Sequence, residues 1–245
     1  MGFERVAVLS DVHGVLPALR AVLREPEVRA ADHVVFCGDN LAGPLPVETL
    51  ELMRSLGDRA TFISGNADRE MVGWSRDGVD PGHDESRWAA EQLSGDEVDF
   101  LAALPPQALV GIDGLGDVLF CHATPRNDHE VRLVDSPPGK WAEAFEGVEA
   151  RTVVCGHTHM PFFRLVDRRR VVNPGSVGMP YGSGPTWCLL GPGVEFRETL
   201  LDAEAAAAEI AERSAFPGAD EFGSGYLVAP PSDVEALEVF TPMVD

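Results

Sequence analysis

Residues 5–14, RVAVLSDVHG, combine a short apolar run with a polar end. The run from Val6 to Leu9 is rich in β-branched residues, which favours a buried strand. Asp11 and His13 follow it, two residues apart. On an extended segment, side chains two residues apart project to the same face, so this pair could share one ion. The stretch therefore predicts a strand with a ligand-type pair at its carboxyl end.

The same pattern occurs twice more in the first 70 residues. HVVFCGDN (33–40) and ATFISGNAD (60–68) are apolar runs with polar ends, and segments of helical spacing separate the three runs. Three strands joined by helices predict a β-α-β-α-β unit with parallel strands. In open α/β sheets, ligand sites form at the carboxyl ends of the strands, where these polar residues fall. We therefore expect an α/β fold with a site at one edge of the sheet.

The second half of the chain is richer in strands. Residues 107–125 predict a hairpin, and a turn at 167–169 joins two further strands. Helical spacing predicts one helix around 86–104 and another around 138–146. The second half thus predicts mostly sheet with a few covering helices.

Two segments lack a clear periodic pattern. The stretch from Arg69 to Gly95 is rich in Gly and Asp, which predicts a surface excursion with a lid or substrate-facing role. Residues 215–245 are acidic and rich in Gly and Pro, so we expect them to pack loosely. No repeat of fixed period is present, and we expect one domain over residues 1–214 with this tail behind it.

The charge of the chain excludes some partners. Lys and Arg total 19 against 40 Asp and Glu, which gives a formal net charge of −21. Such a surface repels nucleic-acid phosphates and anionic membranes, so nonspecific nucleic-acid binding is not expected. A phosphate-bearing substrate would need local positive charge that the side chains do not obviously provide. This need points to bound cations.

We expect a cytoplasmic protein, because the sequence shows no recognisable targeting signal and its cysteines are isolated. No segment approaches the roughly 18 apolar residues of a membrane span, and the N-terminal residues do not resemble a signal peptide. The four cysteines are isolated, without a C-x-x-C motif, so we expect buried thiols in a reducing compartment. They are Cys37, Cys121, Cys155 and Cys188.

Five strand ends carry Asp, Asn or His, and together they hold four of the seven histidines. A single residue of this kind is more often a helix cap, a turn residue or a structural histidine. Five successive strand ends are not explained by separate coincidences, so we predict a metal site. The stretches are SDVHG (10–14), GDN (38–40), GNAD (65–68), CHATP (121–125) and GHTH (156–159).

The ligand types limit the metal. Imidazole, carboxylate and amide oxygen without thiolate suit Mn, Fe, Zn, Ni or Co. Seven ligands are too many for one ion but suit two ions that share a carboxylate. We expect two divalent transition-metal ions, with manganese as the first choice. Two ions about 3.5–4 Å apart can clamp a phosphoryl group and lower the pKa of a bridging water. The candidates are Asp11, His13, Asp39, Asn66, His122, His157 and His159.

The ordered motifs D-x-H, G-D, G-N-x-D, a strand-end His and G-H-x-H resemble those of the calcineurin-like metallophosphoesterases. With NPGSVGMP (173–180), the chain is most similar to the small bacterial and archaeal predicted phosphodiesterases, over about residues 5–200. The resemblance implies a four-layer αββα sandwich of two mixed β-sheets with the metals at the sheet ends. It gives one ion Asp11, His13 and His159, gives the other Asn66, His122 and His157, and makes Asp39 the bridge.

The resemblance also implies catalytic residues, with one departure. The catalytic candidates are Asp39, Asn66, His122 and Asp68. Asp68 could orient Asn66 or a water, and a helix-capping role is equally expected for it. Many members have a proton-donating His where this chain has Ala67. His129 is a candidate substitute, and a plain surface histidine is the alternative.

Substrate contacts are expected next to the motifs. Arg69 and Arg126 directly follow motif residues and could reach a phosphate oxygen, although a surface salt bridge would explain each equally well. Asn40 follows the bridging aspartate and is a third candidate. Specificity is expected to come from residues 70–95 and 126–135.

The predicted function is a di-metal phosphoesterase. It would hydrolyse small-molecule phosphate esters, diesters above all, by in-line attack of a metal-bridging hydroxide. A nucleotide is one candidate substrate. A nucleotide or protein phosphomonoesterase is the alternative within the enzyme class. A non-catalytic metal-binding scaffold, such as the phosphoesterase-like retromer subunit, is the alternative outside it. The sequence leaves the metal, the physiological substrate and the oligomeric state open.

Overall fold

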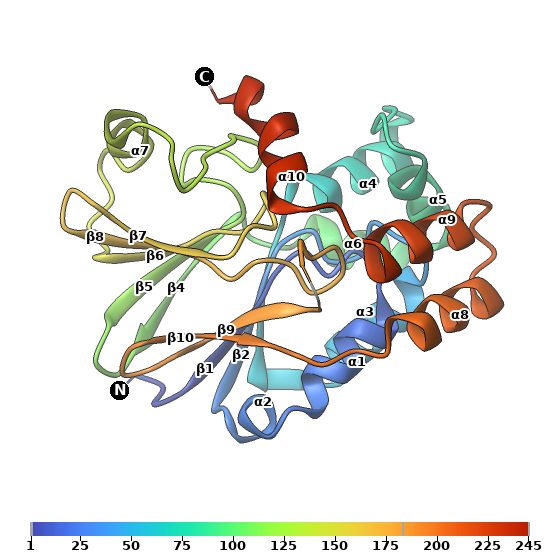
Figure 1. Cartoon of the computed structure of the whole chain (residues 1–245), viewed down its shortest axis with the longest axis horizontal. Coiled ribbons are helices and arrows are strands. Elements are labelled where there is room, and N and C mark those ends of the chain that lie inside the picture. The colour runs from blue at the N-terminus through green and yellow to red at the C-terminus, as the bar shows by residue number, and fades with distance from the viewer. Residues whose placement is uncertain (1, 183, 245) are drawn as a thin grey trace.

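The computed structural model describes residues 2–182 and 184–244. Two five-stranded β-sheets lie at the centre, and helices cover their outer faces (Figure 1). The predicted αββα arrangement is therefore confirmed. What decides it is that the inner faces of both sheets are apolar and pack on each other, while helices cover the outer face of the first sheet and part of that of the second.

The first sheet has the order β10-β9-β1-β2-β3. The three N-terminal strands run parallel, as predicted, and β9 pairs antiparallel with both β1 and β10. The parallel ends place the loops after β1, β2 and β3 side by side at one edge. The strands are β1 (Val6–Leu9), β2 (His33–Cys37), β3 (Ala60–Ile63), β9 (Thr186–Leu190) and β10 (Val194–Glu198).

The second sheet has the order β4-β5-β6-β8-β7. The predicted hairpin forms β4 and β5, while β5, β6 and β8 are parallel. Asp167 and Arg168 both have positive φ in the β7–β8 turn, the pattern of a type I′ hairpin turn. The strands are β4 (Gln107–Ile112), β5 (Gly116–Cys121), β6 (Thr152–Val154), β7 (Phe162–Val166) and β8 (Arg169–Asn173).

Strand β1 shows how the core is divided. Val6 and Val8 belong to the apolar cluster between the two sheets, whereas Ala7 and Leu9 face the helices that cover the first sheet. All four side chains are fully buried. Part of the outer face of the second sheet packs against Trp141 of helix α7 (Pro138–Ala144) in a third cluster. The strand ends are thus fixed from both faces.

Most of the helices cover the outer side of the first sheet (Figure 1). Helix α7 packs on the outer side of the second sheet. The crossovers in the N-terminal unit are helical, as predicted. The helices before the C-terminal segment are α1 (Leu16–Arg24), α2 (Pro26–Ala30), α3 (Pro46–Arg54), a 3₁₀ turn (Gly57–Arg59), α4 (Asn66–Asp77), α5 (Asp84–Gln92), α6 (Gly95–Ala102), α7 (Pro138–Ala144) and α8 (Ala203–Arg213).

The excursion predicted after Arg69 is largely helical, so this part of the prediction was wrong. Helix α4 continues to Asp77, with Met71 buried, and its exposed polar side conceals the periodicity. The single helix expected around 86–104 is two helices. Ser94 and Glu97 form a capping box that begins α6, which explains the break after Gln92.

The C-terminal segment is more ordered than its composition suggests. Phe222 and Leu227 are buried against the first core cluster, so the expectation of loose packing was wrong for the first half of the tail. The second half differs, since Ala236 is the one buried residue of α10. The elements are α9 (Ala219–Gly223), a π-helical turn (Ser224–Val228), α10 (Asp233–Phe240) and a 3₁₀ turn (Thr241–Met243).

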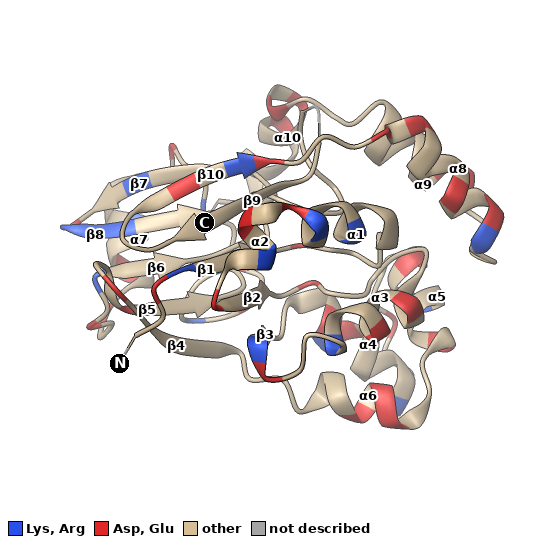
Figure 2. Cartoon of the chain, turned by 90° about the horizontal axis from the view of Figure 1, so that it is seen from below, with Lys and Arg blue, Asp and Glu red and all other residues tan. Residues whose placement is uncertain are grey.

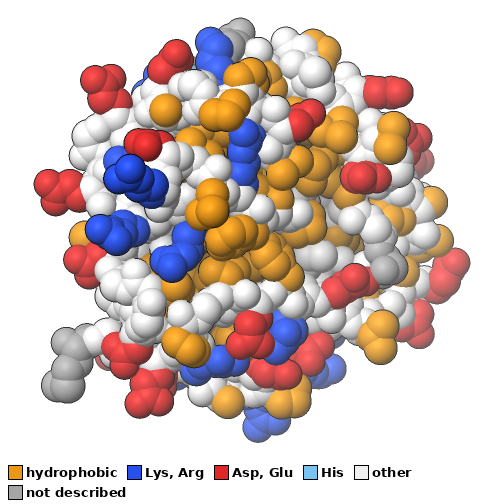
Figure 3. All heavy atoms as spheres, turned by 60° about the vertical axis from the view of Figure 1, so that its left-hand side comes forward, with side chains coloured by type: hydrophobic (Ala, Val, Ile, Leu, Met, Phe, Trp, Pro, Cys, Tyr) orange, Lys and Arg blue, Asp and Glu red, His pale blue; other side chains and the backbone are white. Residues whose placement is uncertain are grey.

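The surface reflects the acidic composition. Asp and Glu are spread over the helices, whereas β7 and β8 are rich in arginine (Figure 2). On the face that Figure 3 shows, exposed hydrophobic side chains lie among basic ones. All four cysteines are free and buried, as predicted. None of the helices in the described ranges is long and apolar enough to cross a bilayer.

Candidate metal centre and its cleft

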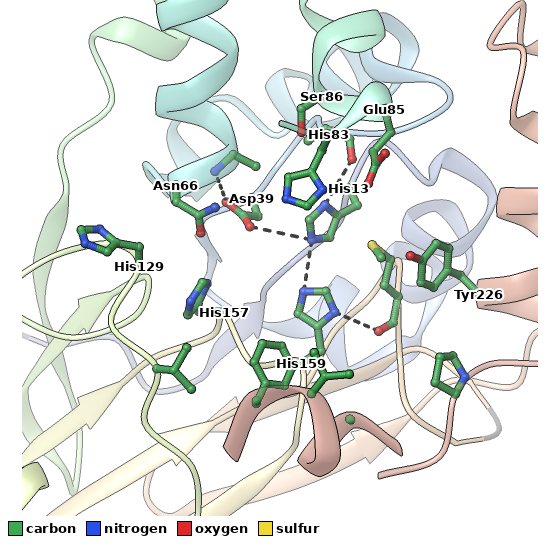
Figure 4. A pocket seen from close by; sticks show the side chains of 18 of the residues that line it. His13, Asp39, Asn66, His83, Glu85, Ser86, His129, His157, His159 and Tyr226 are labelled. Carbon is green, nitrogen blue, oxygen red and sulfur yellow. Dashed lines mark hydrogen bonds and ion pairs between the residues drawn. The ribbon is translucent and has the colours of Figure 1, made fainter. Parts of the chain in front are cut away.

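The seven predicted ligands meet at one edge of the two sheets. They lie at the carboxyl ends of β1, β2, β3, β5 and β6, and the structure therefore brings together residues up to 148 positions apart, from Asp11 to His159. Figure 4 shows His13, Asp39, Asn66, His157 and His159 around a common space.

The carboxylates and imidazoles form two groups that match the predicted division. Asp11, His13 and His159 make one group, and Asp39, His122 and His157 make the other, with the ligand atoms in each within 4.8 Å of one another. Atoms that share one ion at about 2.1 Å lie about 3–4 Å apart, so both groups are spaced to hold a cation.

Asp39 lies between the two groups. Its Oδ2 is 3.3 Å from His122 Nε2 and 3.8 Å from His13 Nε2, so one carboxylate oxygen faces both sets of ligands. Within the first group, His159 Nε2 is 3.2 Å from Asp11 Oδ1 and 3.2 Å from His13 Nε2. This geometry is what a bridging carboxylate requires.

Asn66 completes the second group. The amide atom that faces the histidines lies 3.0 Å from His157 Nδ1 and 3.3 Å from His122 Nε2. As nitrogen it would donate a hydrogen bond to either ring, and as oxygen it would be a fourth ligand for an ion held there. The donor set therefore fits a transition-metal ion in this group.

Backbone carbonyls hold three of the imidazole rings by their Nδ1 atoms. Each ring then presents Nε2 to the centre, because the hydrogen bond on one nitrogen fixes the tautomer. Such support is typical of metal-ligating histidines. The pairs are His13 with Ala42 (3.2 Å), His122 with Cys37 (2.8 Å) and His159 with Met179 (3.1 Å).

The ligand loops have an unusual backbone. Five of the seven predicted ligands adopt positive φ, which is uncommon for residues other than glycine and costs of the order of 1–3 kcal/mol at each position. Such strain clusters at functional sites. The angles are 53° at Asp11, 49° at His13, 51° at Asp39, 66° at His157 and 56° at His159. Asp11 and His13 do lie in one ligand group, but the predicted extended backbone was wrong, since both residues have left-handed backbone angles.

Burial and charge together shift the pKa values of the cluster. Burial disfavours the charged form of His122, but the carboxylates of Asp39 and Asp11 outweigh it and raise its pKa to about 10. Burial and the neighbouring His122 lower the pKa of His157 to about 4. Burial opposes ionisation of Asp39, yet the histidines around it hold its pKa below the ordinary value. Without a metal, a protonated His122 thus supplies positive charge beside the carboxylates of Asp39 and Asp11.

Asp68 fastens two ligand loops together. It accepts hydrogen bonds from the Gly65 N–H (2.9 Å), the Asn40 N–H (3.0 Å) and Asn40 Nδ2 (2.8 Å). The bond to Gly65 is the helix-capping role foreseen as one alternative. Burial and the nearby Asp39 raise the pKa of Asp68 to about 7.

Position 67 acts through its backbone. The Ala67 N–H donates to Asp39 Oδ1 at 2.8 Å, so the first turn of α4 orients the bridging carboxylate. The Ala67 methyl lines the cleft and offers no proton. Position 67 therefore supplies no proton to a leaving group.

The predicted substrate contacts have other partners. Arg69 pairs with Asp128 at 2.6 Å, and Arg126 pairs with Glu130. Asn40 points its amide nitrogen at Asp68 and the Ile63 carbonyl. None of the three lines the cleft. Substrate contacts from these residues stay a prediction, and their present bonds favour structural roles.

A cleft of about 580 Å³ opens over the ligands. His129, the candidate proton donor, lines it, and its Nδ1 lies 2.9 Å from an Asp128 carboxylate oxygen. The beginning of α5 adds His83, Glu85 and Ser86 at its rim (Figure 4). The segments expected to set specificity, 70–95 and 126–135, thus both contribute to the lining.

The C-terminal segment forms a wall of the cleft that the sequence did not suggest. Tyr226 and several side chains of α10 line the cleft opposite the ligands. The signal was present as helical spacing of Ala236, Val239, Phe240 and Met243, but the Gly/Pro-rich composition before it indicated a loose tail.

The family model for the calcineurin-like phosphoesterase superfamily domain matches residues 5–191. The chain belongs to this superfamily. The family is metal-dependent, and the two ligand groups described above lie within the matched region. The protein is therefore a hydrolase that acts on phosphate esters.

Three relatives illustrate the range of similarity. An uncharacterised protein of Methanocaldococcus jannaschii is 27% identical over 71% of this chain and 76% of its own. The symmetrical bis(5'-nucleosyl)-tetraphosphatase of Aliivibrio fischeri is 28% identical over 65% of this chain and 69% of its own. The crystal structure of a metallophosphoesterase from Sphaerobacter thermophilus superposes with a TM-score of 0.73 at 24% identity, over 92% of this chain and 98% of that one. The last comparison shows the shared fold.

Proposed function

We propose that this chain hydrolyses phosphate esters, and diesters in particular, at a centre of two divalent transition-metal ions. The observation that carries the proposal is the convergence of seven ligand side chains in two groups around Asp39. Manganese is the expected metal, with Fe, Zn, Ni and Co as alternatives, because the ligands are imidazole, carboxylate and amide without thiolate. A cytoplasmic location remains an expectation.

Each residue has a distinct part in holding the centre. Asp11, His13 and His159 would hold one ion, Asn66, His122 and His157 the other, and Asp39 would bridge them. When bound, the ions supply positive charge for the phosphoryl oxygens and lower the pKa of a water that attacks phosphorus in line. Asp68 keeps the loops after β2 and β3 together, and the Ala67 N–H aims the Asp39 carboxylate.

The preference for diesters follows from position 67. Its methyl group cannot protonate a leaving oxygen, so esters whose leaving groups depart without help should be favoured. His83 and His129 are the other imidazoles that line the cleft. His129 remains the candidate donor from the sequence, and both rings belong to loops rather than to the centre.

There are two alternatives to a phosphodiesterase. A nucleotide or protein phosphomonoesterase would use the same ligands, and the tetraphosphatase among the relatives makes a nucleotide a reasonable substrate to test. A metal-binding scaffold without activity would be expected to have eroded ligands, whereas all seven are present here and backbone carbonyls support three of the imidazoles.

The test is a metal-reconstitution assay. Purified protein is stripped with a chelator, resupplied with Mn²⁺, and assayed with bis(p-nitrophenyl) phosphate and p-nitrophenyl phosphate. We expect metal-dependent turnover, faster with the diester. Equal or faster turnover of the monoester would refute the diester preference. Absence of both metal uptake and turnover would favour the scaffold.

A further inference from the structure

The C-terminal segment turns an apolar face to the cleft. Ala236, Val239 and Phe240 of α10 and Met243 of the 3₁₀ turn that follows it have i, i+3, i+4, i+7 spacing, and all four line the cleft. We call these four residues the cleft stripe. Val239 and Met243 keep 57% and 53% of their surface exposed, so they do not serve the core.

The chain before the stripe is firmly placed. Phe216 packs against Trp88 of α5 with ring centroids 5.5 Å apart, and Phe222 and Leu227 are buried among the helices of the first sheet. From this anchor the chain passes Tyr226 and Pro231, which also line the cleft, and reaches α10. Figure 1 shows α10 above the carboxyl ends of the strands. The stripe is thus held over the centre by a packed segment.

The same cleft lacks basic side chains. No lysine or arginine is found among its lining residues in the described ranges, while Glu70, Glu85 and Glu235 are. The nearby Arg69 is engaged by Asp128. The arginines of β7 and β8 gather elsewhere (Figure 2). Beyond the metal ligands, the cleft therefore combines apolar surface with carboxylates.

We propose that the substrate carries a single ionised phosphate at the metal centre and a large, uncharged apolar or aryl ester group against the cleft stripe. This proposal rests on the proposed function and narrows its substrate class. A chain of phosphates would place further negative charge beside the three glutamates with no side-chain cation to offset it. An aryl or alkyl group would instead remove the exposed side chains of the stripe from water.

Family membership does not decide this point. The family model ends at residue 191, and the cleft stripe begins at residue 236. The name of the Aliivibrio fischeri relative indicates a tetraphosphate substrate for that protein. The matched region alone does not predict the same substrate for this chain. The stripe is a specificity element outside the region that the family model matches.

The first experiment measures binding with a charge-matched pair of probes. Diphenyl phosphate and dimethyl phosphate carry the same charge and differ in apolar area, and calorimetry on the Mn²⁺-supplied protein gives both affinities. Val239→Ser/Met243→Ser should weaken diphenyl phosphate about 5- to 20-fold and leave dimethyl phosphate nearly unchanged. Val234→Ser is the matched control, since Val234 is on the same helix, 59% exposed, and outside the cleft lining.

The second experiment compares turnover. The wild type should hydrolyse bis(p-nitrophenyl) phosphate with a higher kcat/KM than diadenosine tetraphosphate. A double variant that binds diphenyl phosphate like Val234→Ser, or a preference for the tetraphosphate, would overturn the inference while leaving the proposed function intact. Absence of metal-dependent turnover with every ester would instead overturn the proposed function itself.

Discussion

The ligand loops and α10 face each other across one cleft and are built in opposite ways. The loops are buried, polar and hydrogen-bonded, with Asp11 fully buried and held by Ser10 Oγ at 2.6 Å. Helix α10 is largely exposed, turns an apolar face to the cleft and buries only Ala236. The residues that form the two ligand groups and the residues that we propose to select the substrate therefore lie in separate parts of the chain. The core enforces the ligand geometry, whereas the exposed stripe residues Val239 and Met243 can change at little cost to the fold.

The largest effect is expected at the bridge between the ligand groups. Asp39→Asn keeps an oxygen for the Ala67 N–H but puts an amide nitrogen where one oxygen faces both groups. Turnover should fall by about a hundredfold or more, because the shared carboxylate is lost. The measurement is kcat with bis(p-nitrophenyl) phosphate. Asp117→Asn, exposed at the far end of β5, is the control and should retain full activity.

The second prediction concerns protons that compete with the metal. The pKa of His122 is raised to about 10, so in the metal-free protein the ring is protonated at neutral pH and must lose that proton to bind an ion. Loss of this one proton should therefore raise the metal affinity about tenfold for each unit of pH, up to about pH 10. Calorimetry in buffers of different ionisation enthalpy measures the proton released. Binding without proton release between pH 6 and pH 8 would contradict it.

In the metal-free protein, a rise in pH should lower the free energy of unfolding. Because the folded-state pKa of His122 lies above its ordinary value, its pairing with Asp39 stabilises the fold fully below about pH 6.5 and is lost as the pH rises through about 10. Urea unfolding of chelator-treated protein across this range should show the decline.

The third prediction concerns the clamp between the loops. Asp68→Asn turns an amide nitrogen towards N–H donors of Gly65 or Asn40, so a buried donor loses its acceptor. The free energy of unfolding should fall by about 2 kcal/mol. Asp202→Asn is a matched control, because Asp202 also caps a helix but is exposed, and its effect should be smaller. Equal losses in the two variants would argue against a special role for the clamp.

The smallest effect is expected on the stability of stripe variants. Val239→Ser/Met243→Ser should change the free energy of unfolding by about 0.5 kcal/mol or less, since both side chains are more than half exposed. Urea unfolding is the measurement. A loss comparable to that of Asp68→Asn would mean that the stripe belongs to the core, and the division between the two sides of the cleft would then fail.

The sequence predicted the parts of the site that depend on local patterns. Each ligand lies directly after an apolar strand, so its place at the sheet edge followed from strand polarity alone. The left-handed backbone at Asp39 and His157 was not predictable, because tertiary hydrogen bonds rather than residue type impose it. The ion pair of Arg69 with Asp128 joins residues 59 positions apart and left no local trace.

The C-terminal wall was missed for a different reason. The spacing from Ala236 to Met243 indicates an amphipathic helix, but amphipathic faces are usually read as core-facing, and a segment rich in Gly and Pro precedes this one. Only the fold reveals that the apolar face looks onto a cleft. The two sides of the site therefore differ in predictability as they do in construction.

We claim that two ions share Asp39, and anomalous X-ray diffraction from crystals supplied with Mn²⁺ can test this. The expected result is two anomalous peaks about 3.5–4 Å apart, with Asp39 between them. One peak should lie among Asp11, His13 and His159, and the other among Asn66, His122 and His157. A single peak, or peaks away from Asp39, would contradict the claim.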